Sequence, residues 1–332
     1  MSWRHDNHWQ RSAITIAVQI PRMKHPTTRQ PVFLLLLLCL LFPGCRHAVD
    51  EIKVANSAQI DDLPEPSYGP HDWPCWRGSA LNGMATGEAP PTNWSREENL
   101  RWQIELPFSG HASPTVVGNQ VFIAAADEAE ETQYVFSYDR STGAEVWRSV
   151  IHQKGFMYKH SKNSHASATP ASDGSRLFAV CMIQDGIWVT ALDLEGKQLW
   201  QTKAGPFRSR HGYGSSPVLY KSLVIVAGDG NGGGFLAALH RKTGKLVWRV
   251  QRSHQASFCT PVIARIADQD QLLMSGQKEV ISYNPATGKP LWKSSGPATT
   301  TANTLVWNDQ LVFASGGYPQ RSIMAIKADG SG

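Results

Sequence analysis

The chain has little of what marks an enzyme or a metalloprotein. Its 332 residues include five cysteines, no two of them adjacent, and neither a CxxC nor an HExxH motif, which excludes the usual dithiol and zinc patterns. The Gly-x-Ser-x-Gly turn of α/β-hydrolases is also missing. The longest apolar run, residues 32–42, has eleven residues and is too short to span a bilayer comfortably.

Charge of one sign is scarce once the start of the chain is set aside. The formal net charge is +5, and four of these charges come from five basic residues and one aspartate before residue 45. The chain from Cys45 onward is left with +1. The isoelectric point near 8.9 therefore reflects the N-terminal segment, and we expect no nucleic-acid partner.

The apolar run predicts the core of a secretory signal, because two basic residues precede it. Residues 1–44 are therefore expected to form a targeting segment. The stretch before the run is long for a signal peptide, so Met23 is an alternative start. Residues 45–70 are polar and proline-containing, and they predict a flexible tether. Residues 71–332 are expected to fold.

Cys45 is a candidate lipidation site. It follows Leu41-Phe42-Pro43-Gly44, which resembles a bacterial lipobox and predicts a diacylated cysteine that anchors the exported protein to a membrane. The alternative is a plain secretory signal followed by an incidental cysteine, because phenylalanine and proline are not preferred there. Among the later cysteines, Cys181 lies in an apolar run typical of a buried strand. The sequence leaves undecided whether two of the three remaining cysteines form a disulfide: Cys75, Cys181 and Cys259.

A box of nine or ten residues that ends in tryptophan recurs along the chain. Copies end at residues 147, 200, 248 and 292, and a fifth begins at residue 326. Counted from Trp102, successive tryptophans are separated by 45, 53, 48 and 44 residues, which suits the four short strands of a propeller blade. The box residues expected to build the blades are Trp102, Trp147, Trp200, Trp248 and Trp292, with Gly143, Gly196, Gly244 and Gly288.

Each box predicts the hairpin between the last two strands of a blade. Glycine takes the positive-φ position, and the tryptophan ring fills the gap between neighbouring blades. A small residue followed by proline opens each first strand, and apolar β-branched runs follow. Residues 100–104 are expected to form a lone outer strand of the kind that closes a ring. The expected blades are 113–151, 167–205, 215–253, 259–297 and 301–332.

The box is similar to the repeat of the pyrroloquinoline-quinone (PQQ)-like β-propeller superfamily, roughly Ala-x-Asp-x-x-Thr-Gly-x-x-x-Trp. The similarity covers residues 71–332, and the stretches 73–78 and 211–220 resemble exported PQQ-binding-like repeat proteins of planctomycete-type bacteria. The resemblance implies an all-β propeller of four-stranded antiparallel blades, with about five blades present. It also implies a chain truncated from seven or eight blades, because such proteins run on past residue 332.

The resemblance leaves activity open, because this superfamily holds both quinoprotein alcohol dehydrogenases and scaffolds similar to BamB, an outer-membrane assembly lipoprotein. The enzymes would need PQQ in the channel, a calcium or similar ion, and an aspartate base. The large quinoprotein alcohol dehydrogenases also carry two adjacent cysteines, which this chain lacks. We therefore expect a non-catalytic scaffold. The alternative is a PQQ-dependent oxidoreductase or a remnant of one.

Four histidines each lie shortly before the proline that opens a blade. In a propeller these loops lead from outer to inner strands, so the four side chains are expected near one mouth of the channel. Converging imidazoles there could hold a transition metal or an anionic ligand. Their offsets of 3, 5, 6 and 7 residues are unequal, so simple polar loop positions are the alternative. The four residues are His111, His165, His211 and His254.

Together these patterns predict an exported protein of the periplasm or cell envelope. It is expected to be anchored through its N-terminus and to bind protein partners or a small ligand at the propeller loops. No residue is assigned a catalytic role.

Overall fold

The computed structural model describes residues 51–52, 60–87, 89–184, 186–231, 233–252 and 254–331. The chain divides into two units, residues 1–44 and 45–332, and every described residue belongs to the second. The predicted targeting segment and Cys45 lie outside the described residues. Within the described ranges there is no helix, and therefore none that could cross a membrane.

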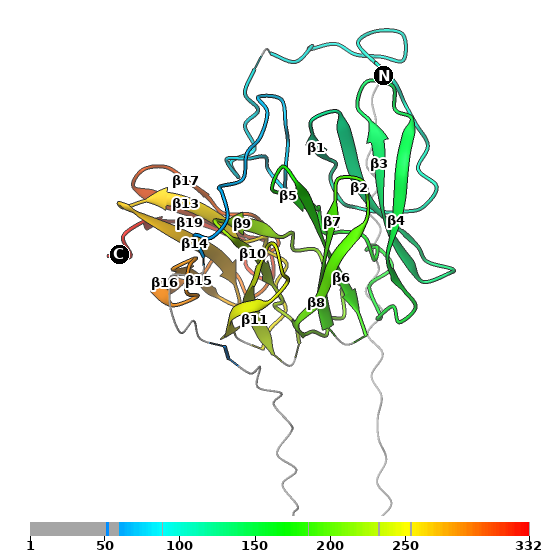
Figure 1. The fold of residues 1–332 in the computed structure, drawn as a ribbon. Coiled ribbons are helices and arrows are strands. Elements are labelled where there is room, and N and C mark those ends of the chain that lie inside the picture. The colour runs from blue at the N-terminus through cyan, green and yellow to red at the C-terminus, as the bar shows by residue number, and fades with distance from the viewer. Residues whose placement is uncertain are drawn as a thin grey trace, which may run out of the picture. The chain divides into compact units, whose positions relative to one another are not determined.

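The described strands form five antiparallel sheets that follow one another along the chain (Figure 1). The first sheet contains β1 (Thr115–Val117), β2 (Gln120–Asp127), β3 (Thr132–Asp139) and β4 (Glu145–Gln153). The second contains β5 (Ala171–Ser172), β6 (Arg176–Ile183), β7 (Gly186–Asp193) and β8 (Gln198–Pro206). The third contains β9 (Val218–Tyr220), β10 (Leu223–Ala227), β11 (Gly234–His240) and β12 (Leu246–Arg252).

The fourth sheet contains β13 (Val262–Ile266), β14 (Gln269–Gly276), β15 (Glu279–Tyr283) and β16 (Pro290–Ser295). The fifth has three strands, β17 (Val306–Trp307), β18 (Leu311–Gly316) and β19 (Ser322–Lys327). Each sheet lies inside one of the predicted blades or within two residues of it, and strand order follows chain order. The predicted propeller of four-stranded antiparallel blades is therefore confirmed, with a fifth blade of three described strands.

The hydrophobic core lies between the blades. One cluster joins apolar side chains of β6 and β7 to those of β10 and β11, and another joins the first blade to the second. A sheet stacked between two others buries both of its faces, so β10 and β11 are buried at every position. This explains why their sequences are continuous apolar runs without alternation.

The tryptophans link each blade to the next, as predicted. Every indole Nε1 donates a hydrogen bond to a backbone carbonyl in the following turn, at 2.9 to 3.2 Å. The tryptophan side chain also covers the turn glycine so closely that a Cβ added to the glycine would lie 2.5 to 2.7 Å from the nearest tryptophan atom. The pairs are Trp102 with Gly143, Trp147 with Gly196, Trp200 with Gly244, Trp248 with Gly288, and Trp292 with Gly330.

Trp102 makes this contact although its own segment is not a strand. Residues 100–106 lie in no sheet, so the lone strand expected at residues 100–104 is absent from the structure. The indole nevertheless donates to the carbonyl of Arg140 at 2.9 Å. The indole contact therefore forms without the sheet pairing that accompanies it in the later blades.

A segment before the first blade, residues 60–83, lies against several blades, and we call it the strap. Trp73 and Val116 of β1 exchange two backbone hydrogen bonds of 2.8 and 2.9 Å. The carbonyl of Pro74 accepts a hydrogen bond from the amide of Ser172 in β5. The strap also places two side chains in the core of the third and fourth blades, Ile60 and Leu81. Its first part overlaps the predicted tether.

Candidate functional site

Each blade has two ends because its strands alternate in direction. The end that holds the glycine turns of the boxes is called the turn end, and in Figure 1 the arrow of β3 points up toward it. The opposite end, called the loop end, holds the loops that connect one blade to the next. Four of these loops, residues 154–170, 207–217, 254–261 and 296–305, lead into the first strands of blades two to five.

Hydroxyl side chains position the loop end. In blades two to four, the small residue before the blade-opening proline accepts a hydrogen bond from the backbone amide of the equivalent residue in the preceding blade. The three bonds are each 3.0 Å and run from Ser113 N to Thr169 Oγ1, from Thr169 N to Ser216 Oγ, and from Ser216 N to Thr260 Oγ1. We call this series the hydroxyl ladder. It gives the small-residue-proline step a structural role and sets the spacing of the loops.

A cavity of about 590 Å³ lies at the loop end of blades three to five. The loops before β9 and β13 supply most of its wall, and the loop before β17 and the β10–β11 and β18–β19 turns complete it. Three of its side chains are basic or can become so, two are aromatic, and none of its described lining residues is a carboxylate. The lining residues are Arg210, His211, Asn231, His254, Gln255, Ala256, Phe258, Thr299, Thr300 and Tyr318.

The structure brings two of the four candidate histidines together. His211 and His254 both line the loop-end cavity and are exposed. The ring of His211 lies edge-on to Phe258 at 5.8 Å between centroids, and the centroid of the His160 ring lies 5.7 Å from that of His211. These two imidazoles can therefore meet a ligand that enters the cavity.

The other two histidines make contacts elsewhere at the loop end. His165 has its Nδ1 2.7 Å from a carboxylate oxygen of Glu128 and its Nε2 2.8 Å from the carbonyl of Met157, so neither ring nitrogen is left for a metal ion. A hydrogen bond of 2.9 Å joins His111 Nδ1 to Ser164 Oγ. Nowhere in the described ranges do three His, Cys, Asp or Glu side chains gather in a way that could hold a metal ion.

A buried ion pair beside the loop end was not predicted. Arg252, at the end of β12, donates from Nε and Nη2 to both carboxylate oxygens of Asp229 at 2.7 and 2.8 Å. Its Nη1 donates to the hydroxyl of Tyr283 in the next blade at 2.7 Å. Burial opposes the charge of Arg252, but Asp229 and Tyr283 hold its pKa above the usual value. Only the spatial pairing reveals this group, because Asp229 alone reads as part of a glycine-rich turn.

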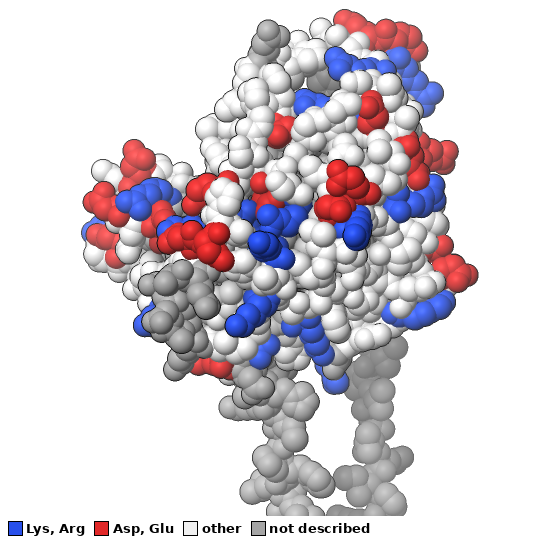
Figure 2. Space-filling view, in the orientation of Figure 1, with Lys and Arg blue, Asp and Glu red and all other residues white. Residues whose placement is uncertain are grey.

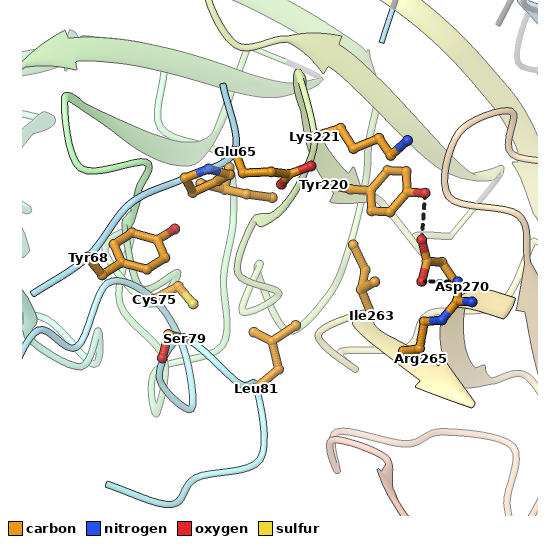
Figure 3. Close-up of a pocket in the computed structure, with 12 residues that line it drawn as sticks. Glu65, Tyr68, Cys75, Ser79, Leu81, Tyr220, Lys221, Ile263, Arg265 and Asp270 are labelled. Atoms are coloured by element: carbon orange, nitrogen blue, oxygen red, sulfur yellow. Dashed lines mark hydrogen bonds and ion pairs between the residues drawn. The ribbon is translucent and has the colours of Figure 1, made fainter. Parts of the chain in front are cut away.

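A second cavity, of about 370 Å³, lies between the strap and the blades (Figure 3). Tyr68 and Cys75 of the strap face Tyr220 and Asp270 of the blades across it. The Tyr220 hydroxyl donates to Asp270 at 2.9 Å, and Arg265 pairs with the same carboxylate at 3.3 Å. These polar groups are thus satisfied within the chain.

The thiol in this strap cavity is not a reactive one. Burial raises the pKa of Cys75 to about 12, and its thiol donates to the carbonyl of Gly78 at 3.2 Å. A thiol that stays protonated is a weak nucleophile. All three described cysteines are buried and have free thiols, so no disulfide forms among them.

Comparisons with known proteins agree with this architecture. A family model described as "Outer membrane protein assembly factor BamB" matches residues 131–331. Among the curated proteins no match was found. Among solved structures, a europium-containing methanol dehydrogenase is 16% identical, with a TM-score of 0.51 over 78% of this chain and 55% of that chain.

Two further solved structures resemble the chain. BamB from Moraxella catarrhalis is 18% identical with a TM-score of 0.43, over 69% of this chain and 73% of that chain. A quinohemoprotein alcohol dehydrogenase from Pseudomonas putida HK5 is 13% identical with a TM-score of 0.49, over 79% of this chain and 47% of that chain. The chain thus spans about half the length of the two dehydrogenases. Its repeats and its family match together show that the chain belongs to the BamB-type family of the PQQ-like β-propeller superfamily.

Proposed function

We propose that the chain is a non-catalytic scaffold of the cell envelope that docks a protein partner at the loop end of its blades. The carrying observation is the lining of the loop-end cavity, which combines Arg210, Phe258 and Tyr318 with polar side chains and no carboxylate. Arginine and aromatic side chains dominate the binding energy of many protein interfaces. The family described as an outer membrane assembly factor supports the same function.

Exposed aromatic surface adds support. Tyr318 is 74% exposed at the rim of the cavity, and Tyr158 is equally exposed in the loop before β5. Large exposed aromatic side chains near a cavity are typical of surfaces that a partner covers. The loop end therefore has anchors for a partner as well as a cavity to receive one.

A PQQ-dependent oxidoreductase, or a remnant of one, is the alternative that the dehydrogenase neighbours favour. Such a site would need a cation held by carboxylate and amide oxygens beside the quinone. The buried carboxylate nearest the loop end, Asp229, is held on both oxygens by Arg252, and no described cluster offers a metal its ligands. The described residues therefore do not fit the quinone site, and we derive no step through it.

Photo-crosslinking tests the docking surface. A photoreactive amino acid at Tyr318, at the loop end, should give a discrete crosslinked partner in intact cells. The same amino acid at Leu199, which is 45% exposed near the start of β8, is the matched control and should not. Equal crosslinking from both positions would contradict a specific loop-end surface. A stoichiometric quinone absorbance after addition of PQQ and calcium, with dye reduction, would favour the enzyme instead.

Export and lipid anchoring at Cys45 belong to the same proposal. Metabolic labelling with a fatty-acid analogue should mark the wild-type protein, and Cys45→Ser should abolish the label. Cys39→Ser, in the apolar run that precedes Cys45, is the matched control and should leave labelling intact. Labelling of the Cys45 variant at the wild-type level would show that the lipid is attached elsewhere. Absence of label from the wild-type protein would contradict the lipid anchor.

A further inference from the structure

We infer that the loop-end cavity binds carboxylate side chains of an extended acidic segment in the partner protein. The inference rests on the proposed function and adds the chemistry of the partner. It starts from the four loops that lead into blades two to five.

These four loops contain no aspartate or glutamate at all. They carry five basic side chains, Lys154, Lys159, Lys162, Arg208 and Arg210, in a chain whose net charge from residue 45 onward is only +1. Figure 2 shows basic and acidic side chains interleaved over most of the visible face, with mainly basic ones along its lower edge. Positive charge is thus concentrated in these four loops, although the positive and negative charges of the chain from residue 45 onward nearly cancel.

Three acidic side chains at the loop end already have cationic partners. Glu128 and Glu130, in the β2–β3 turn, lie 3.6 Å from Lys159 and Lys154 respectively. Asp229 is bound on both oxygens by Arg252. These carboxylates are therefore not available to neutralise the basic groups of the cavity.

The basic side chains of the cavity have no acidic partner within the described chain. In the part of the chain that the structure describes, neither Arg210 nor His211 nor His254 forms an ion pair. Arg210 is exposed, so its planar guanidinium can take a carboxylate through two parallel hydrogen bonds. A carboxylate that enters the cavity would therefore meet no competing carboxylate among its described lining residues.

The distribution of charge favours a chain-like ligand over a small one. Arg208 lies in the same loop as Arg210, and Lys162 lies in the loop before β5; neither side chain lines the cavity. An anion confined to the cavity would leave them without a counter-charge. An extended acidic segment can place one carboxylate beside Arg210 and others along the neighbouring loops, while Phe258 and Tyr318 pack against its apolar parts.

Fluorescence anisotropy on the full chain tests this directly. The probe is a short labelled peptide of alternating glutamate and glycine, and the matched peptide has glutamine in place of glutamate. We expect the glutamate peptide to bind at least about 10-fold more tightly, with an affinity that falls as salt screens the charges. Arg210→Glu should weaken binding by about 10-fold or more, and Arg210→Gln by less, since it removes the charge without reversing it.

Lys245→Glu is the matched control, because it makes the same charge change at an exposed position in a box turn. It should leave affinity within about 2-fold. Equal binding of the two peptides, or equal losses from the Lys245 and Arg210 variants, would overturn the inference. So would free glutarate that binds the cavity as tightly as the peptide does, because the ligand would then be a small carboxylate.

The outcomes also separate this inference from the proposed function. If a photoreactive residue at Tyr318 crosslinks a partner but the acidic peptide does not bind, the proposed scaffold function is supported and the inference of an acidic ligand is overturned. If the Arg210→Glu protein unfolds, the exposed Arg210→Gln and His254→Gln variants still decide the question through their affinities. Unchanged affinity in both would overturn the inference.

Discussion

At the residue scale, the joint between blades depends on the absence of a side chain at one position in each turn. Gly244 has a φ of +69°, and an added Cβ would lie 2.5 Å from Cε3 of Trp200. The left-handed conformation and the ring together exclude other residues. Gly118 shares the positive φ, at +56°, but an added Cβ there meets nothing within 4 Å.

These two glycines separate backbone strain from steric conflict. Gly244→Ala should lower the free energy of unfolding by about 2–4 kcal/mol, because it adds a clash to the left-handed strain. Gly118→Ala should cost only about 1 kcal/mol, because it carries the strain alone. Urea denaturation of both variants measures the difference. Equal losses would show that the tryptophan ring moves aside freely.

The Arg252–Asp229 pair is a second feature of this scale. Arg252→Met leaves Asp229 buried and unpaired, so we expect a loss of about 3–5 kcal/mol in the free energy of unfolding. The matched control is Arg265→Ala, which breaks the partly exposed pair with Asp270 and should cost less than about 1 kcal/mol. A small loss at Arg252, seen by chemical denaturation, would mean that water reaches the freed carboxylate.

At the element scale, the hydroxyl ladder joins the blades at their loop end. Thr169 is buried and both accepts from Ser113 and donates to Ser216. Thr169→Val keeps the shape but leaves the Ser113 amide without its acceptor, and should cost about 1–3 kcal/mol. Thr169→Ser retains the hydroxyl and should cost less. If thermal melts show equal losses for both variants, packing of the methyl group matters more than the hydrogen bond.

The strap is docked partly through a carboxylate. A hydrogen bond from His240 lowers the pKa of Asp62, with a contribution from Ser222. A lowered folded-state pKa adds stability above the ordinary Asp value of about 3.9, and this stability is lost as pH falls through the folded pKa. Asp62→Asn should therefore be less stable than wild type near neutral pH and equally stable in strong acid.

Urea melts across this pH range measure that difference. Asp268→Asn, at an exposed turn between β13 and β14, is the control and should track the wild type throughout. A constant gap between the Asp62 variant and wild type at every pH would mean that the carboxylate charge is not what holds the strap.

At the scale of the whole molecule, stability should vary from blade to blade. Blades two and three are covered on both sides, and β10 and β11 are buried at every position, whereas β19 at the last blade is mostly exposed. In a stack of repeats, each unit draws stability from its neighbours. Native-state hydrogen exchange should therefore be slowest in β10 and β11 and fastest in β17–β19. Uniform protection across the blades would contradict this gradient.

The sequence predicted the blades well because their signals are local. Glycine, an aliphatic residue and tryptophan lie within one turn and strand, so the box alone predicts the hairpin and the position of the ring. The strap contacts and the Arg252–Asp229 pair were missed because they join residues 23 to 178 positions apart. The candidate site was predicted in part, since His211 and His254 reach one cavity, whereas His165 is taken up by Glu128 and Met157.

The tryptophan joint has a direction. Each blade offers an indole to the blade that follows it and a glycine turn to the blade that precedes it, so every junction is the same head-to-tail fit. Because every junction is alike, the junction does not determine the number of blades in the molecule. Whole blades could therefore be duplicated or lost during evolution without the need for a new kind of interface between blades. Blade number is then free to diverge among relatives while the joint itself stays the same.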